Sequence, residues 1–324
     1  MHKSSAFDQM QSSPEAAPIG IVERVDELDK KIMAELQTNC RVSYQELSRT
    51  HGISANAIRR RILHLEETGE IAGYSVYLSP AMMGAERLFG LLSSDGTRDE
   101  FELVDEIGSH RNILAAAAYS NGTYALVAEY RSSEEFLDLS SFLRKLESIK
   151  AVELHPILAP RGTAIELSAL HLRVLKPLLE DPCMSVVEIA KKSGLTARRV
   201  RRLLDQLESS GAIRFRALLE LGAASSIPFI AKITWDEKKT TYLPILDWIE
   251  KTYPLVHWES YVSASEPVLY SLLAAQNLTE AVKFTREIRN HSPVKGVMAF
   301  FGGHHKFFAN YRRSKLREMV ESID

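Results

Sequence analysis

The sequence predicts an α+β protein made of two copies of one unit, in which a helical part is followed by a part rich in strands. Placing Leu28 on Leu170 and keeping that register superimposes 12 identical residues within 44 positions without a gap. Within each copy, the apolar spacing changes from the 3.6-residue period of helices to the two-residue period of strands. A chain of 324 residues with 45% hydrophobic side chains is large enough to bury several cores.

The repeat covers almost everything after residue 27. The same shift that aligns the helical parts also places Ile107 on Ile249 and Tyr119 on Tyr261. The predicted domains are therefore 25–80 and 166–221 for the helical parts, 85–160 and 227–303 for the strand-rich parts, and a C-terminal helix at 304–324.

The composition limits the cellular context. Residues 1–24 are polar and rich in proline and serine, which predicts a disordered tail without the apolar stretch of a secretory signal. No apolar run approaches the length of a membrane span, and two cysteines, Cys40 and Cys183, suit a reducing compartment as ordinary reduced thiols. We expect a cytoplasmic, nucleoid-associated protein. The net charge of -2 means that any contact with a polyanion depends on a local basic patch.

The first helical part contains the signals of three helices. A stripe of Leu28, Ile32 and Leu36 marks the first helix, and Ser43 with Glu46 three residues later is a capping box that starts the second. Gly52 ends the second helix, and the third helix follows from Ser54 to Gly69 with a buried face of Ile58, Ile62 and Leu65. Three helices with a tight turn between the last two predict a helix-turn-helix, and residues 71–78 predict the strand of a wing.

The strand-rich part predicts the order βαββαβ, which is the ferredoxin-like arrangement. Asn121-Gly122 between two apolar runs is a strong hairpin signal. The expected elements are a strand at 87–93, a helix at 101–107, strands at 113–119 and 124–130, a helix at 136–146 and a strand at 149–158. The fold class is thus two winged helix-turn-helix domains alternating with two ferredoxin-like βαββαβ domains.

These motifs resemble the Lrp/AsnC family of prokaryotic transcription regulators. The most specific element is Arg61-Ile62-x-x-Leu65-Glu66-x-x-Gly69-x-Ile71, which is similar to the end of the family's recognition helix and returns in the second copy from Leu203 to Ile213. The tandem fusion looks most like archaeal members. The resemblance implies DNA binding by the helical parts, and dimerisation and small-molecule sensing by the βαββαβ domains.

The hairpin pattern of that family, Gly-x-Tyr/Phe-Asp, is not kept in either copy. The first copy has Ala125 in place of the aspartate, and the second reads Ala264-Ser265-Glu266-Pro267. The effector therefore stays unidentified, and amino-acid sensing is not expected from the motif.

We expect the third helix of each helical part to lie in the major groove, with outward side chains at its start on base edges. Asn56 suits adenine, Arg60 suits guanine, and Arg61 is expected near the phosphates; the alternative is a solvated basic face. The predicted DNA-binding residues are Ser54, Asn56, Ala57, Arg59, Arg60 and Arg61 in the first copy, and Thr196, Arg198, Arg199, Arg201 and Arg202 in the second.

The two copies differ in charge. Between Ser185 and Arg216 the second copy has eight basic and three acidic side chains, whereas Ser43 to Leu78 has four of each. Because phosphate neutralisation supplies the sequence-independent part of affinity, we expect the second copy to contribute more of the binding energy.

Two alternative functions remain open. The same architecture resembles siroheme decarboxylases of haem synthesis, which would need a cationic, histidine-bearing pocket; the hairpin regions 115–119 and 258–261 offer little of this. A sensing module that has lost DNA binding is the other alternative.

We expect no catalytic residue, metal or cofactor, and the partners are duplex DNA and a second chain, paired through the βαββαβ sheet faces. His304-His305 is read as exposed polar residues rather than a metal site. The amphipathic segment 306–320 is expected to pack on the second βαββαβ domain.

Overall fold

The computed structural model describes residues 25–223, 226–302, 304–308 and 311–322, so the predicted tail at 1–24 lies outside the described residues. The chain divides into two compact units, which are described separately. Among the described residues, unit 1 comprises 25–82, 162–220 and 312–322, and unit 2 comprises 83–161 and those described between 221 and 311. The two helical parts thus share unit 1, and the two strand-rich parts share unit 2. Within the described ranges, every helix is too short or too polar to span a membrane.

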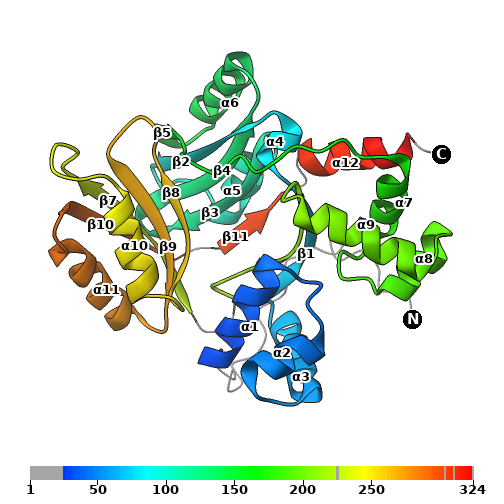
Figure 1. The fold of residues 1–324 in the computed structure, drawn as a ribbon. Helices are drawn as coiled ribbons and strands as arrows, with labels where there is room; N and C mark the ends of the chain where they lie inside the picture. Colours follow the sequence, from blue (N-terminus) through cyan, green and yellow to red (C-terminus); the bar gives the residue numbers. More distant parts are fainter. Residues whose placement is uncertain (1–24, 224–225, 303, 309–310, 323–324) are drawn as a thin grey trace. The chain divides into compact units, whose positions relative to one another are not determined.

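The first helical part of unit 1 consists of α1 (Glu27–Thr38), α2 (Tyr44–His51) and α3 (Ala55–Glu67) (Figure 1). We call this helix trio reader 1. The predicted capping box is confirmed, because the Ser43 side chain accepts from the backbone N–H of Glu46 while the Glu46 side chain accepts from that of Ser43. Gly52 ends α2 with a left-handed φ of 70°, a conformation that costs glycine little.

The second helical part repeats this arrangement with α7 (Ala169–Leu178), α8 (Val186–Ser193) and α9 (Ala197–Ser209), which form reader 2. Ser185 and Glu188 form the equivalent capping box, and Gly194 ends α8 with φ 68°. The apolar stripes of both readers are buried; the residues at 3% exposure or less include Ile32, Leu47, Ile58, Leu65, Val174, Leu175, Ile189, Val200 and Leu207.

The strands predicted as wings pair with each other. β1 (Ile71–Leu78) and β6 (Ile213–Leu219) form a two-stranded antiparallel sheet between the readers. Tyr74 pairs with Ala217, and Ser75 pairs with Arg216. The repeat shift converts the first of these pairs into the second, so the register itself is two-fold symmetric. The central part of this strand pair is therefore locally two-fold symmetric.

The first βαββαβ domain of unit 2 has the predicted element order. Its elements are β2 (Glu86–Ser94), α5 (Glu100–Gly108), β3 (Ile113–Tyr119), β4 (Thr123–Tyr130), α6 (Ser133–Lys145) and β5 (Ile149–Pro156). The strands are antiparallel in the order β3-β4-β2-β5. Asn121 and Gly122 both have positive φ, at 61° and 64°, as the hairpin signal requires. The short helix α4 (Pro80–Met83) precedes this domain.

The second βαββαβ domain has the same topology. Its elements are β7 (Ile227–Trp235), α10 (Leu243–Thr252), β8 (His257–Val262), β9 (Val268–Ala275), α11 (Leu278–Asn290) and β10 (Val294–Phe301), with the strand order β10-β7-β9-β8. The ferredoxin-like prediction is confirmed for both copies.

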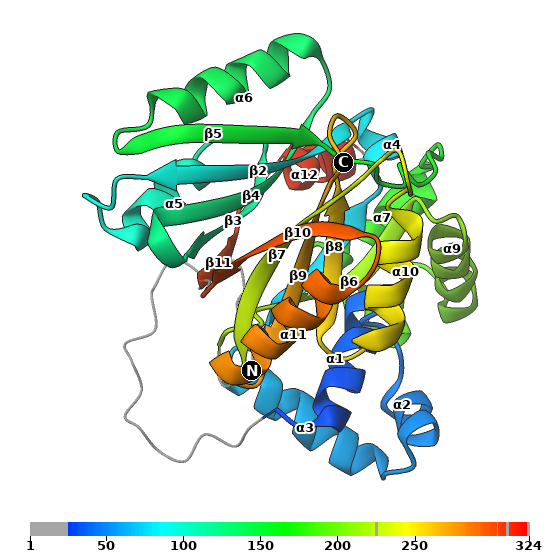
Figure 2. The same ribbon diagram turned by 90° about the vertical axis from the view of Figure 1, so that its left-hand side faces the viewer.

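Both faces of each sheet are buried. The helices cover one face, as α10 and α11 do for the second sheet in Figure 2, over cores that include Leu88 and Leu126 in the first domain and Phe229 and Leu273 in the second. The opposite faces meet in one core, whose buried residues are Phe89, Leu91, Ala117, Tyr119, Ala125, Ile157, Ile230, Tyr261, Val268 and Tyr270. The sheet faces that suggested pairing between two chains thus bury each other within one chain.

The C-terminal segment differs from the prediction. Residues His304–Phe307 form a strand, β11, which pairs with β3 as a fifth strand of the first sheet. The helix α12 spans Tyr311–Glu321 and its residues from 312 belong to unit 1, where the Arg312 guanidinium donates to the Leu78 carbonyl and lies 4.1 Å from the Tyr77 ring centroid. The expected helix from residue 304, packed on the second βαββαβ domain, is therefore wrong. Residues 304–307 pair with the edge of β3, whose backbone hydrogen-bonding groups would otherwise lack a strand partner. The spacing of apolar residues in the sequence does not show which strand lies at an edge.

Candidate nucleic-acid interface

The outward face of α3 presents most of the residues that the sequence predicted for DNA contact. Asn56, Arg59 and Arg60 are exposed, and Ala57 is half-buried. Their orientation follows from the helical period, because Ile58 and Ile62 of the same helix are fixed in the core. The polar side chains at the start of α3 are therefore available to a ligand.

Ser54 and Thr196 act as helix caps. The Ser54 hydroxyl accepts from the backbone N–H of Ala57 at 3.2 Å, and the Thr196 hydroxyl accepts from that of Arg199 at 3.3 Å. Both residues lie at the start of a recognition helix, where further backbone N–H groups favour an anion. A phosphate contact at either helix start is compatible with this capping role.

Arg61 has a different environment from the one predicted. Its guanidinium forms ion pairs of 2.7 Å with both Asp26 and Asp29 of α1 and its cap, and Asp29 is buried. The hydrogen bond to Asp29 raises the pKa of Arg61. Burial acts to raise the pKa of Asp26, but the hydrogen bonds that Asp26 accepts from the Asp29 backbone and from Arg61 outweigh it, so the pKa of Asp26 is lowered. These contacts tie α3 to α1 and neutralise the charge, so the structure does not support Arg61 as a phosphate ligand.

The outward face of α9 is more basic than that of α3. All four of its arginines, Arg198, Arg199, Arg201 and Arg202, lie on the outward face, and none forms an ion pair with another described residue. Val200 and Leu204 of the same helix are buried and fix its orientation. Four cations on α9 thus face outward, whereas α3 offers Arg59 and Arg60.

The difference in charge persists when matched ranges are compared. Residues 43–78 carry four basic and four acidic side chains, whereas residues 185–220 carry eight basic and four acidic ones, because Glu220 belongs to the matched range. Lys192 is paired with Glu180 at 2.8 Å, and Arg216 lies over the Tyr77 ring at 4.3 Å. The cations left for a polyanion are therefore concentrated on α9.

Hydrogen bonds also join the two readers through the segment between α1 and α2 and the segment between α7 and α8. Arg41 Nη1 donates to the carbonyl oxygens of Pro182 at 2.9 Å and Met184 at 3.0 Å, and Cys40 N donates to the Phe215 carbonyl at 2.8 Å. Sequence reasoning missed this set of contacts because each partner lies in the other copy. With the β1–β6 sheet, they hold α3 and α9 in one unit.

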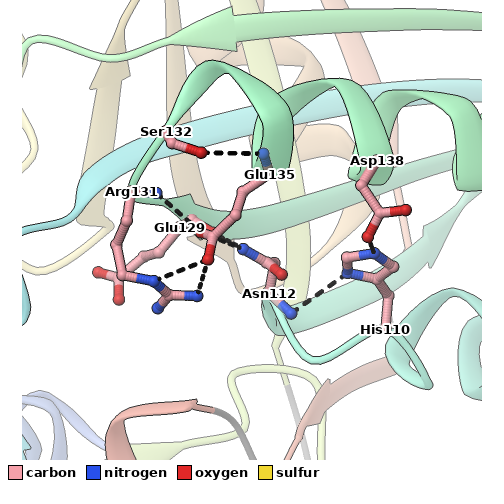
Figure 3. A network of polar contacts seen from close by, with 7 residues as sticks. All are labelled: His110, Asn112, Glu129, Arg131, Ser132, Glu135 and Asp138. Carbon is pink, nitrogen blue, oxygen red and sulfur yellow. Dashed lines mark hydrogen bonds and ion pairs between the residues drawn. The ribbon is translucent and has the colours of Figure 1, made fainter.

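A polar network in unit 2 is a second candidate site (Figure 3). Its hydrogen bonds connect neighbouring elements of the fold. Glu135 of α6 accepts from Arg131 Nη2 at 2.8 Å, from the backbone N–H of Arg131 at 2.9 Å and from Asn112 Nδ2 at 3.2 Å. Asn112 Nδ2 also donates to the Glu129 carbonyl at 2.6 Å. The contacts fasten the start of α6 to β4 and to the loop before β3, so these groups serve the fold.

The described histidines lie in separate environments. No group of three metal-ligating side chains occurs among the described residues. His155 is buried between Tyr270 Oη at 2.9 Å and Ser263 Oγ at 3.2 Å, and burial lowers its pKa. His305 contacts Tyr119 Oη at 3.1 Å. A cavity of about 370 Å³ beside α10 and α11 contains Lys283 and Glu287 among mostly apolar side chains and has no histidine in its lining.

Two family models match the chain. An AsnC-type helix-turn-helix domain matches residues 25–66, and a winged helix-turn-helix DNA-binding domain matches residues 167–214. These matches coincide with readers 1 and 2.

Curated relatives are transcription regulators. An uncharacterised HTH-type transcriptional regulator of Pyrococcus horikoshii is 42% identical over 81 residues, which are 25% of this chain and 47% of that protein. The HTH-type transcriptional regulator LrpA of the same organism is 29% identical over 135 residues, or 40% of this chain and 92% of that protein.

One similar solved structure covers most of the chain. The siroheme decarboxylase NirDL is 15% identical, with a TM-score of 0.54 over 92% of this chain and 99% of that one. This similarity supports the duplicated fold alone.

Proposed function

We propose that the chain is a tandem-duplicated transcription regulator of the Lrp/AsnC type and that readers 1 and 2 bind one DNA duplex together. The observation that supports the proposal is the pseudo-two-fold pairing of β1 with β6, which places two recognition helices in one unit. Paired readers of this class contact half-sites about one helical turn, roughly 34 Å, apart. One chain then supplies what two chains supply in single-unit relatives.

The proposed contacts differ between the half-sites. Asn56 reads adenine and Arg60 reads guanine in the half-site of α3, and the four arginines of α9 bind the other half-site with more phosphate contacts. The operator is therefore an imperfect palindrome. Ser54, Ala57, Arg59 and Thr196 complete the proposed interface, without Arg61.

We propose that unit 2 joins the two halves of a single chain. Because its sheet faces bury each other within the chain, pairing of two chains through those faces is no longer favoured, and one chain with two readers is sufficient. Light scattering tests this point: a 36 kDa particle supports it, and a stable particle of twice that mass contradicts it. A small-molecule effector remains a prediction, as does association with the nucleoid.

Selection of bound duplexes from a random pool is the direct experiment. We expect enrichment of two related half-sites one helical turn apart, with retention that falls steeply as salt rises. Failure to retain any duplex at low salt would contradict DNA binding. In that case the absorbance of siroheme mixed with the protein decides whether the enzyme alternative, suggested by the fold similarity, applies.

A further inference from the structure

The chain has two cysteines, and the fold brings them together. Cys40 follows α1 in reader 1, and Cys183 precedes α8 in reader 2. Both are free thiols, and Cys183 Sγ donates a hydrogen bond to Cys40 Sγ over 2.6 Å. Cys40 is buried, whereas Cys183 is half-buried. We call them the thiol pair.

The backbone on both sides of the thiol pair is held by hydrogen bonds. Cys40 N donates to the Phe215 carbonyl at 2.8 Å, and Cys183 N donates to Asp181 Oδ1 at 3.0 Å. Arg41, next to Cys40, donates to the carbonyls of both residues that flank Cys183. A disulfide bond of about 2.05 Å needs the sulfur atoms to approach by about half an ångström.

We propose that Cys40 and Cys183 are a thiol–disulfide site, at which a small disulfide such as oxidised glutathione links readers 1 and 2 covalently. The half-buried Cys183 is the sulfur that a small oxidant reaches. Its thiolate attacks the oxidant, forms a mixed disulfide and releases one small thiol; Cys40 then attacks Cys183 Sγ and releases the second. The protein loses two electrons and two protons, and the oxidant is reduced to two thiols.

The environment of Cys183 makes this reaction slow. The hydrogen bond to Cys40, together with burial, raises the pKa of Cys183, so a small fraction of it is thiolate at neutral pH. Oxidation therefore accelerates as the pH rises. The resulting bond joins the two readers covalently.

The experiment counts thiols in the full chain without using DNA. The purified protein is incubated with excess oxidised glutathione at pH 8, denatured, and treated with a polyethylene-glycol maleimide. We expect two labels on the reduced chain, none on the oxidised chain, and one tryptic cross-link containing Cys40 and Cys183. Because the measurement does not involve DNA, its failure and a failure of DNA binding are separate results.

Cys183→Ser is the matched control, since its position is the less buried of the two. This variant is expected to retain Cys40 and give one label after the same treatment, or one mixed disulfide with glutathione. Cys40→Ser gives the reciprocal result where it folds. Two reactive thiols in the oxidised wild-type chain, or a disulfide that joins two chains, would overturn the proposal.

Discussion

Exchanging the first outward pair of α9 for the pair found in α3 tests the asymmetry of the two readers. In the repeat, Arg198 and Arg199 occupy the places of Asn56 and Ala57. The variant Arg198→Asn/Arg199→Ala therefore gives reader 2 the residues of reader 1 at these places. Neither arginine is buried and neither forms an ion pair within the described residues, so the exchange leaves no buried group without a partner.

The expected loss follows from the number of phosphates neutralised. With Arg60 assigned to a base, five outward arginines remain for phosphates, Arg59 on α3 and four on α9, and they give a slope of log K against log salt of about -4.5, at about -0.9 for each phosphate contact. Loss of two contacts changes the slope to about -2.7. At 0.1 M salt this difference corresponds to roughly 60-fold weaker binding, or about 2.4 kcal/mol.

The assay is fluorescence anisotropy on one selected duplex between 50 and 200 mM salt. The reciprocal variant, Asn56→Arg/Ala57→Arg, is the matched control and should steepen the slope by about 1.8. Thermal melting shows whether each variant remains folded. A slope for Arg198→Asn/Arg199→Ala within about 0.5 of the wild-type value would refute the reasoning, because the α9 arginines would then lie away from the phosphates.

Three further changes test other parts of the structure. Arg61→Leu, which introduces the residue of the second copy, should lower the unfolding free energy by about 1–3 kcal/mol because Asp29 loses its partner in a buried position, and should leave the salt slope of DNA binding unchanged; a slope reduced by about one would instead make Arg61 a phosphate ligand. Stability should fall as the pH drops below about 6.5, because burial lowers the pKa of both His155 and His257 in the fold and the unfolded chain then binds more protons. In His155→Gln the melting temperature should fall less steeply as the pH drops below about 6.5, because burial outweighs Glu266 and Glu153, which act to raise the His155 pKa. An unchanged pH dependence of the melting temperature would contradict this role of His155. Gly108→Ala drives a Cβ into the Phe308 ring, so β11 should detach and become sensitive to limited proteolysis, whereas protection equal to that of the wild type would argue against the docking.

The local elements could be predicted because their signals are short-range. The capping boxes at Ser43 and Ser185, the turn glycines Gly52 and Gly194, and the Asn121-Gly122 hairpin each depend on residues close to one another in the chain. The repeat then transferred each element from one copy to the other. The outward face of each recognition helix followed from its buried stripe.

The pairing of the copies could not be predicted from the same signals. An alternating strand such as 71–78 has the same pattern whether its partner is in its own domain or in the other copy. The role of Arg61 could not be predicted because Asp26 and Asp29, which form ion pairs with it, belong to α1 and its N-terminal cap. The capture of residues 304–307 depended on an open edge at β3, which only the completed sheet presents.

The sequence alone therefore determined the repeat, the two kinds of domain and the basic recognition helices, because period, caps and charge are local properties. The tertiary structure decided that the readers share one unit, that the sheet faces bury each other within one chain, and that Cys40 meets Cys183. These outcomes depend on long-range packing between residues that lie far apart in the sequence.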